Sequence, residues 1–251
     1  MLRLSAMRID QRALDGLRDF SLTPGFITQA AGSVLVQAGL TRVICTASPA
    51  DKTPKWLKKG GWVTAEYAML PGATHSRGRR DPGGRGKEIQ RLIGRALRAA
   101  VDLPALVGPE GPISIICDCD VIEADGGTRT ASITGAFVAL SLAIRTLIAD
   151  GRLEKSPIIA PVAAVSVGIV PAEVTGDSVG MLDLNYHEDS RAVVDCNVVM
   201  RGRGEQTGLV EVQGTGEEGI FSRAELSTML DLAEGGISHL MAAQAQALGE
   251  A

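Results

Sequence analysis

The chain has 251 residues, of which 45% are hydrophobic and 22% charged, and its net charge is −4 at pH 7. These values are typical of a globular domain and exclude a general polyanion-binding protein, which would need a strong positive charge. No apolar run reaches the roughly 18 residues of a membrane span, and the N-terminus lacks the apolar segment of a secretory signal. We therefore expect a cytoplasmic protein without a membrane partner.

The four cysteines lie within segments that we expect to be strands, and none belongs to a Cys-x-x-Cys pair; they are Cys45, Cys117, Cys119 and Cys196. Cysteine is among the most often buried residue types, so we expect buried, reduced thiols. A zinc site lacks enough ligands at a useful spacing.

The first hundred residues are expected to form mainly strands, followed by one helix. Residues 1–30 show a mixed pattern, whereas runs of strand-forming residues predict strands over 33–37, 42–47 and 62–69, the first two as a hairpin. Apolar residues then recur at helical spacing over 89–101 and predict an amphipathic helix.

Positive charge is concentrated in two loops of this first part. One is a lysine-rich loop through Pro54 and Lys59, and the other is a basic, glycine-rich loop over residues 71–86. From His75 to Lys87 this part of the chain contains Arg77, Arg79, Arg80, Arg85 and Lys87, opposed only by Asp81. Such a local field suits a chain of phosphates.

The second part of the chain begins with an alternating run over residues 113–122, a strand that stops at Gly126-Gly127. A helix follows from near Thr130, and a capping box at Ser222 and Glu225 opens a C-terminal helix. Further strands are expected over 162–170, 181–186, 193–200 and 209–212. Clusters of strands between single helices predict an α+β fold with mixed sheets. We expect one domain over 1–251, built from two packed βα halves, roughly 1–105 and 106–251.

The turn at Gly127 is a candidate anion site. The first amides of a helix lack intrahelical partners and carry the positive end of the helix dipole, and glycines let the backbone approach a ligand closely. Thr128 and Arg129 add a hydroxyl and a guanidinium. An ordinary turn with a surface arginine fits the pattern too, but a cation opposes the dipole there by roughly 0.3–1 kcal/mol, and a bound anion would explain Arg129.

A second basic helix start lies at Gly83-Gly84-Arg85-Gly86-Lys87, which we expect to precede the helix at Ile89. Glycine-rich loops beside helix starts can hold phosphate through their amides. The spacing is not that of a P-loop. Alone the pattern is weak, and paired with the Gly127 turn it favours a phosphate site that includes Arg85.

Two carboxylates, Asp183 and Asp189, form the third feature. Asp183 is expected within an apolar strand, where a lone carboxylate is costly unless it is paired or bound to metal. Two nearby carboxylates suit Mg²⁺, and alternatively one of them acts as a general acid. The remaining alternative is that Asp189 caps a turn and Asp183 faces solvent.

Two further patterns are rejected. Gly214 to Gly219 fits Gly-x-Gly-x-x-Gly, but Glu217 and Glu218 would repel a pyrophosphate and no later strand completes a βαβ unit. His75 and His187 have no serine or cysteine partner at a recognisable spacing, so no catalytic triad is assigned.

The sequence resembles the ribonuclease PH family, bacterial phosphate-dependent 3′-exoribonucleases. The resemblance spans nearly the whole chain, without the second such domain and the RNA-binding modules of polynucleotide phosphorylase. It is carried by residues 62–71, Gly84-Arg85 with 88–93, Asp118-Cys-Asp120, 124–135, 162–170 and 183–190.

The resemblance implies a ribosomal protein S5 domain 2-like fold and a homohexameric ring, a trimer of dimers. It implies trimming of 3′ single-stranded ends of tRNA precursors, with RNA rather than DNA as partner, inorganic phosphate as co-substrate and Mg²⁺ as cofactor. Nucleoside diphosphates would be released reversibly. The implied phosphate-binding residues are Arg85, Gly127, Thr128 and Arg129; the catalytic and metal-binding residues are Asp183 and Asp189; and the RNA-binding residues are Arg77, Arg79, Arg80 and Arg91.

The chain departs from the family pattern in four places. Gly72 replaces a usual arginine, the basic loop before Gly83 is shorter, Gly86-Lys87 replaces a Thr-Met pair, and residues 171–180 are lengthened. These departures concern RNA affinity and ring geometry rather than phosphate chemistry. Two alternatives to the implied function are a catalytically silent RNA-binding ring subunit of an exosome-like complex and a metal-dependent hydrolytic nuclease.

Overall fold

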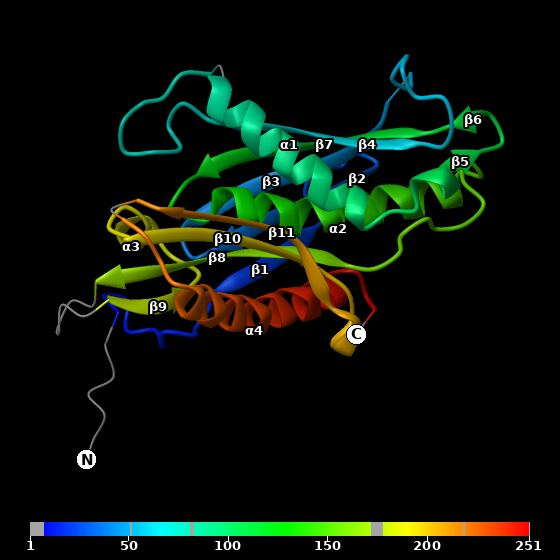
Figure 1. The fold of residues 1–251 in the computed structure, drawn as a ribbon. Coiled ribbons are helices and arrows are strands. Elements are labelled where there is room, and N and C mark those ends of the chain that lie inside the picture. The colour runs from blue at the N-terminus through cyan, green and yellow to red at the C-terminus, as the bar shows by residue number, and fades with distance from the viewer. Residues whose placement is uncertain (1–7, 51, 81–82, 172–177, 218, 251) are drawn as a thin grey trace.

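The computed structural model describes residues 8–50, 52–80, 83–171, 178–217 and 219–250. Most of the segment expected to be lengthened, together with Asp81 and Glu218, lies outside these residues. Within the described residues, the two larger sheets and three of the helices form successive layers (Figure 1): a five-stranded sheet, helices α1 (Gly83–Ala99) and α2 (Thr128–Ala149), a four-stranded sheet, and helix α4 (Arg223–Ala247). This is the predicted α+β arrangement.

The first sheet contains one parallel pair, β4 with β7, and is otherwise antiparallel, so it is a mixed sheet. Its strand order is β1-β2-β3-β7-β4, with β1 at Phe20–Pro24, β2 at Gly32–Ala38, β3 at Thr41–Pro49, β4 at Trp62–Met69 and β7 at Ser114–Glu123. A small hairpin pairs β5 (Val107–Gly108) with β6 (Gly111–Pro112). The edge strand β1 was not predicted, because its alternation is short and half of it is polar.

The second sheet is antiparallel, with the order β11-β10-β8-β9. Its strands are β8 at Val162–Pro171, β9 at Ser178–Leu182, β10 at Val194–Arg201 and β11 at Gly208–Gly216. The helices are α1 at Gly83–Ala99, α2 at Thr128–Ala149, α3 at Tyr186–Asp189 and α4 at Arg223–Ala247. The capping box at Ser222 is present, as predicted.

Helix α2 is the centre of the molecule, in contact with β2, β3 and α1 on one side and with β8 on the other. Among the described helices it alone is long and apolar enough to cross a membrane, but 78% of its apolar window is buried inside the protein. Glycines allow this close packing: a Cβ on Gly32 would lie 2.0 Å from the carbonyl oxygen of Ala139. The four cysteines are buried and free, as predicted.

Two sequence-based boundaries differ from the structure. Strand β9 ends at Leu182 rather than Tyr186, because Asp183 adopts a left-handed conformation (φ 53°) that a strand cannot continue. The segment from Gly83 to Lys87 forms the first turns of α1 rather than a loop before it. The division expected near residue 105 stays a prediction; β7, which follows it, pairs between β3 and β4 of the first sheet.

Candidate phosphate and RNA site

The turn between β7 and α2 leaves backbone amides open at the start of a helix. Gly126 (φ 75°) and Gly127 (φ 64°) are both left-handed, and Gly127 caps α2 without a side-chain hydrogen bond. The amides of the first turn therefore remain available to an anion. Thr128 presents its hydroxyl beside them, hydrogen-bonded to the Tyr67 hydroxyl at 2.8 Å.

Two arginines from separate helices lie near the Tyr67–Thr128 hydrogen bond: Arg129 directly follows Thr128 in the chain, and Arg85 lines a cavity together with Tyr67. Burial raises the pKa of Tyr67, whereas its hydrogen bond to Thr128 and the charges of Arg85 and Arg129 lower it. Arg129 lies in the first turn of α2 and Arg85 in the first turn of α1. The fold thus brings both predicted basic helix starts near Tyr67. The positive charges of Arg85 and Arg129 both act on its hydroxyl.

Asp189, at the end of α3, lies in the electrostatic field of the same arginines. Burial raises its pKa, and the charges of Arg129 and Arg85 oppose that rise. A second carboxylate, Asp195 on β10, lies close enough to repel it: burial, followed by the charge of Asp189, raises the pKa of Asp195 to about 6. Asp189 therefore has a carboxylate neighbour in Asp195 that the sequence analysis did not predict, and its predicted pairing with Asp183 stays a prediction.

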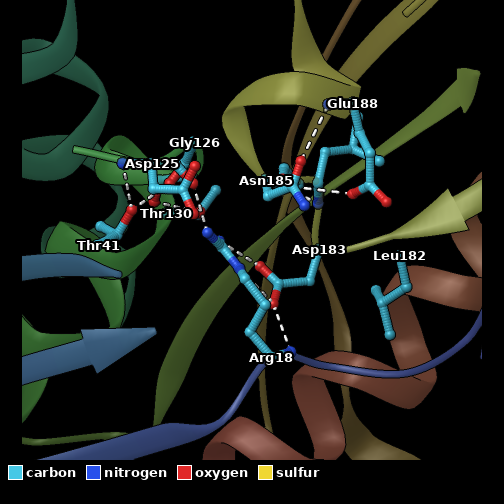
Figure 2. A network of polar contacts seen from close by, with 12 residues as sticks. Arg18, Thr41, Asp125, Gly126, Thr130, Leu182, Asp183, Asn185 and Glu188 are labelled. Carbon is cyan, nitrogen blue, oxygen red and sulfur yellow. Dashed lines mark hydrogen bonds and ion pairs between the residues drawn. The ribbon is translucent and has the colours of Figure 1, made fainter. Parts of the chain in front are cut away.

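Asp183 is buried and paired with an arginine from the N-terminal segment. Its carboxylate accepts hydrogen bonds from the Arg18 backbone nitrogen at 2.8 Å, from Nε at 3.0 Å and from Nη2 at 2.7 Å (Figure 2). Burial alone would raise the pKa of Asp183, but the hydrogen bonds and charge of Arg18 outweigh it and lower the pKa. The alternative of a solvent-facing Asp183 is therefore wrong, and its desolvation is compensated by Arg18.

Arg18 also connects this pair to the glycine turn. Its Nη1 donates to the carbonyl oxygen of Asp125, directly before Gly126 (Figure 2). The carboxylate of the same Asp125 accepts a hydrogen bond from the backbone nitrogen of Tyr186 at 3.2 Å. The network fixes the anion-binding turn relative to the segment that carries Asp189.

A second buried ion pair holds α3 itself. Arg8 donates from Nε to the Glu188 carboxylate at 2.7 Å, and the two side chains are almost fully buried. Glu188 also completes a capping box with Asn185 at the start of α3. Because Asp189 directly follows Glu188, this anchorage limits how far the Asp189 carboxylate can move.

The predicted RNA-binding arginines are exposed on one side of this site. Arg79, Arg80 and Arg85 line a cavity of about 150 Å³ together with Tyr67. Arg77 lies on the same loop, and Arg91 is exposed farther along α1. The structure therefore joins the basic loop to the phosphate-binding arginine and leaves Arg91 outside the cavity.

Comparison with known proteins identifies the family of this arrangement. The 3′ exoribonuclease family matches with its domain 1 over residues 16–145 and its domain 2 over residues 160–236. A ribonuclease PH of Corynebacterium glutamicum is 55% identical over 252 residues, 98% of each chain. One from Bacillus pumilus is 53% identical over 251 residues, 97% of this chain and 99% of the relative.

The chain belongs to the ribonuclease PH family. Its activity is that of a phosphorolytic 3′-to-5′ exoribonuclease, a nucleotidyltransferase that uses inorganic phosphate as co-substrate. The predicted family, activity and enzyme class are confirmed.

Solved structures with the same fold are more distant in sequence. The Archaeoglobus fulgidus exosome with RNA bound to its active site has a TM-score of 0.76 at 22% identity, covering 93% of this chain and 91% of that one. Rice Rrp46 has a TM-score of 0.73 at 18% identity, covering 94% and 98%. These likenesses confirm the predicted ribonuclease PH fold.

Sequence reasoning missed the residues that organise the site. Arg18 and Arg8 carry no local pattern, because the carboxylate that each one pairs with lies more than 160 positions away along the chain. Asp195 did leave a signal: with Asn197 it places polar side chains at alternate positions in an otherwise apolar strand. Polar residues on one face of a buried strand indicate a polar site beside it.

Proposed function

We propose that the chain shortens the 3′ ends of tRNA precursors by in-line attack of inorganic phosphate on the terminal phosphodiester. An oxygen of the attacking phosphate bonds to the phosphorus of the last nucleotide. The 3′ oxygen of the preceding nucleotide leaves and takes up a proton, and a nucleoside diphosphate is released. Because a phosphodiester is exchanged for a phosphoanhydride, the ratio of phosphate to nucleoside diphosphate sets the direction.

The single observation that supports this most strongly is the meeting of Arg85, Arg129 and the open amides after Gly127 around the Tyr67–Thr128 hydrogen bond. Attack of one anion on another is opposed by charge repulsion. Preorganised positive groups that hold the nucleophile reduce this repulsion in the transition state. We assign the inorganic phosphate to this place, and the RNA 3′ end to the side of the basic loop.

We further propose that Asp189 and Asp195 hold Mg²⁺ when it is bound. The fit rests on the charge of Asp189, which together with burial raises the pKa of Asp195 and which a cation between the two carboxylates would offset. Among the described residues no cluster of three or more acidic, histidine or cysteine side chains is suited to a metal. That agrees with Mg²⁺, which takes one or two carboxylates and completes its shell with water and substrate phosphate. The ion would stabilise charge on the bridging and leaving oxygens.

In this proposal Asp183 positions Arg18 and the glycine turn through the three hydrogen bonds that its carboxylate accepts from Arg18, and its predicted metal contact stays a prediction. Asp195, with a pKa of about 6, could instead donate the proton that the leaving 3′ oxygen needs. The hexameric ring and the cytoplasmic location remain proposals that rest on the family. A silent subunit is disfavoured, because such a subunit tolerates loss of Arg85, Arg129 or Asp189, and all three are present.

The decisive assay incubates 3′-extended tRNA with the full chain and Mg²⁺, with and without inorganic phosphate, and separates the released nucleotides. We expect nucleoside diphosphates, and only when phosphate is added. Nucleoside monophosphates under both conditions would identify a hydrolytic nuclease instead. Absence of any product would favour the silent ring subunit.

A further inference from the structure

The loop between β3 and β4 carries an unusual concentration of positive charge. Residues 52–60, here called the lysine loop, contain four of the six lysines in the chain. All four side chains are exposed, and none is paired with another residue that the structure describes; they are Lys52, Lys55, Lys58 and Lys59. An evenly solvated surface would not gather two thirds of the lysines within eight residues, and none of them belongs to the phosphate site.

An exposed tryptophan stands among these lysines. The Trp56 side chain is 61% exposed, and its ring meets the Trp62 ring edge-on, with centroids 4.8 Å apart and planes at 88°. The Arg98 guanidinium covers the Trp62 ring at 4.5 Å and donates to the Val63 carbonyl oxygen at 2.9 Å. The contact with Trp62 therefore covers only part of Trp56, and most of the Trp56 surface stays open to a planar partner.

The base of the loop is fixed to the protein body. A Cβ on Gly60 would lie 2.7 Å from the Leu103 carbonyl oxygen, and one on Gly61 would lie 2.3 Å from that of Ile113. The Gly61 and Trp62 amides donate to these same two carbonyl oxygens, at 2.8 and 3.0 Å. The loop thus presents its lysines and Trp56 from a defined position.

Helix α1 relates this loop to the phosphate site. Arg85 lies in the first turn of α1 and Arg98 in its last, and the 17-residue helix is ~25 Å long. Arg91 is exposed between them. In Figure 1 the lysine loop rises beside β6, at the opposite end of the first sheet from α3. The loop is therefore outside the reacting centre, at a distance that only a longer RNA can span.

We propose that the lysine loop binds the substrate RNA upstream of its 3′ end. The lysines contact phosphates, and Trp56 stacks on an unpaired base. An exposed aromatic within a cluster of cations favours RNA over an acidic protein surface, which has no base to stack. The inference rests on the proposed function, since it assumes that the RNA 3′ end lies near Arg85. A stacked RNA of four nucleotides spans ~14 Å and does not reach the loop.

The test compares a 3′-extended tRNA with a four-nucleotide RNA on the full chain. The variants are Trp56→Ala and the triple change Lys55→Glu, Lys58→Glu and Lys59→Glu. Their matched controls are Trp56→Phe and the triple change of the same lysines to arginine. Dissociation constants are measured without phosphate at several salt concentrations, kcat/KM is measured with phosphate, and thermal unfolding verifies the fold.

We expect Trp56→Ala to weaken binding of the extended tRNA roughly tenfold. The glutamate triple variant should lower the slope of log affinity against log salt by ~2–3. Both should leave kcat/KM for the short RNA unchanged, and both controls should behave like the wild type. Extended tRNA should also quench the fluorescence of the two-tryptophan chain, and Trp56→Ala should remove most of that quenching.

Unchanged affinity of the Trp56→Ala and glutamate variants for extended tRNA would overturn the inference, as would equal losses on both RNAs, which would place the effect at the reacting centre. If only the glutamate triple variant lost affinity for extended tRNA, the lysines would attract polyanions in general and the stacking role of Trp56 would be rejected. Because binding is measured without phosphate, a failure of the proposed chemistry would appear separately, as a wild-type chain that binds RNA but releases no diphosphates.

Discussion

Arg85 and Lys87 are two exposed cations in the first turns of the same helix, and only Arg85 lines the cavity beside Tyr67. We expect Arg85→Ala to raise the phosphate concentration for half-maximal rate roughly 10- to 100-fold, because a hydrogen bond to a charged group is lost. Lys87→Ala is the control, with little change expected. Steady-state phosphorolysis measures the effect, and an equal loss of tRNA affinity in Arg85→Ala would contradict its phosphate role.

The buried Asp195 carboxylate lowers the free energy of unfolding when it is ionised. Its folded pKa of about 6 lies above its ordinary value of 3.8, so its ionisation in the folded state opposes folding above pH 6. We expect Asp195→Asn to abolish phosphorolysis while raising the free energy of unfolding at pH 7 by at most ~3 kcal/mol. The gain should shrink as pH falls from 6 to 4, where the wild-type carboxyl protonates.

Urea unfolding at pH 7 and pH 4 measures this difference. The exposed Asp231 on α4 offers the control, since Asp231→Asn should change neither stability nor activity. A destabilised Asp195→Asn protein at pH 7 would show that the carboxylate is stabilised by its surroundings, against the proposal.

At the scale of elements, the glycine turn must fit closely against the segment that leads into α3. A Cβ on Gly126 would lie 2.6 Å from the Leu184 carbonyl oxygen, whereas one on Gly151, also left-handed, would meet nothing within 4 Å. We expect Gly151→Ala to cost ~1 kcal/mol and Gly126→Ala a further ~1–3 kcal/mol, with loss of activity only in the latter. If Gly126→Ala and Gly151→Ala lost the same amount of stability and of phosphorolytic activity, this close packing at Gly126 would be contradicted.

The Arg18–Asp183 pair joins the N-terminal segment to the end of β9. Arg18→Met leaves the buried Asp183 with only the longer ion pair to Arg12, at 3.6 Å, and should cost ~3 kcal/mol at pH 7. Arg42→Met is the matched control: it breaks the half-exposed pair with Glu123 and should cost less than ~1 kcal/mol. The Arg18 effect should diminish below pH 4, because the pKa of Asp183 is lowered in the fold and its contribution is lost on protonation.

Chemical denaturation across pH 3 to 7 follows this change. An Arg18→Met effect that persisted unchanged at pH 3 would mean that packing, rather than the ion pair, supplies the stability.

At the scale of the molecule, the second sheet ends in an exposed edge. Strand β11 is an edge strand, and its Leu209 and Val212 side chains are 53% and 38% exposed. Unpaired edges with apolar side chains are readily covered by another chain. If six copies of the 26.2-kDa chain form the proposed ring, sedimentation equilibrium should give about 157 kDa. A monomer mass at micromolar concentration would reject the hexamer.

Local patterns predicted most of the elements. Strand β4 spans the predicted Trp62–Met69, and α2 and the capped α4 begin within two residues of the predicted positions. Alternation, helical spacing and capping depend on residues within a few positions of one another, so they can be recognised in the sequence alone. The Gly127 turn belongs to the same class, because a strand, two glycines and a helix start are neighbours in the chain.

The amino-acid sequence alone was enough to predict the α+β elements, the family and the residue types of a phosphate site. The partners of its buried carboxylates depend on the tertiary structure, which pairs Asp183 with Arg18 and brings Asp195 near Asp189. Burial removes water from a charged group, so the charge must be compensated by whichever partner the fold brings near it. That partner here lies 165 positions away along the chain, beyond any local pattern.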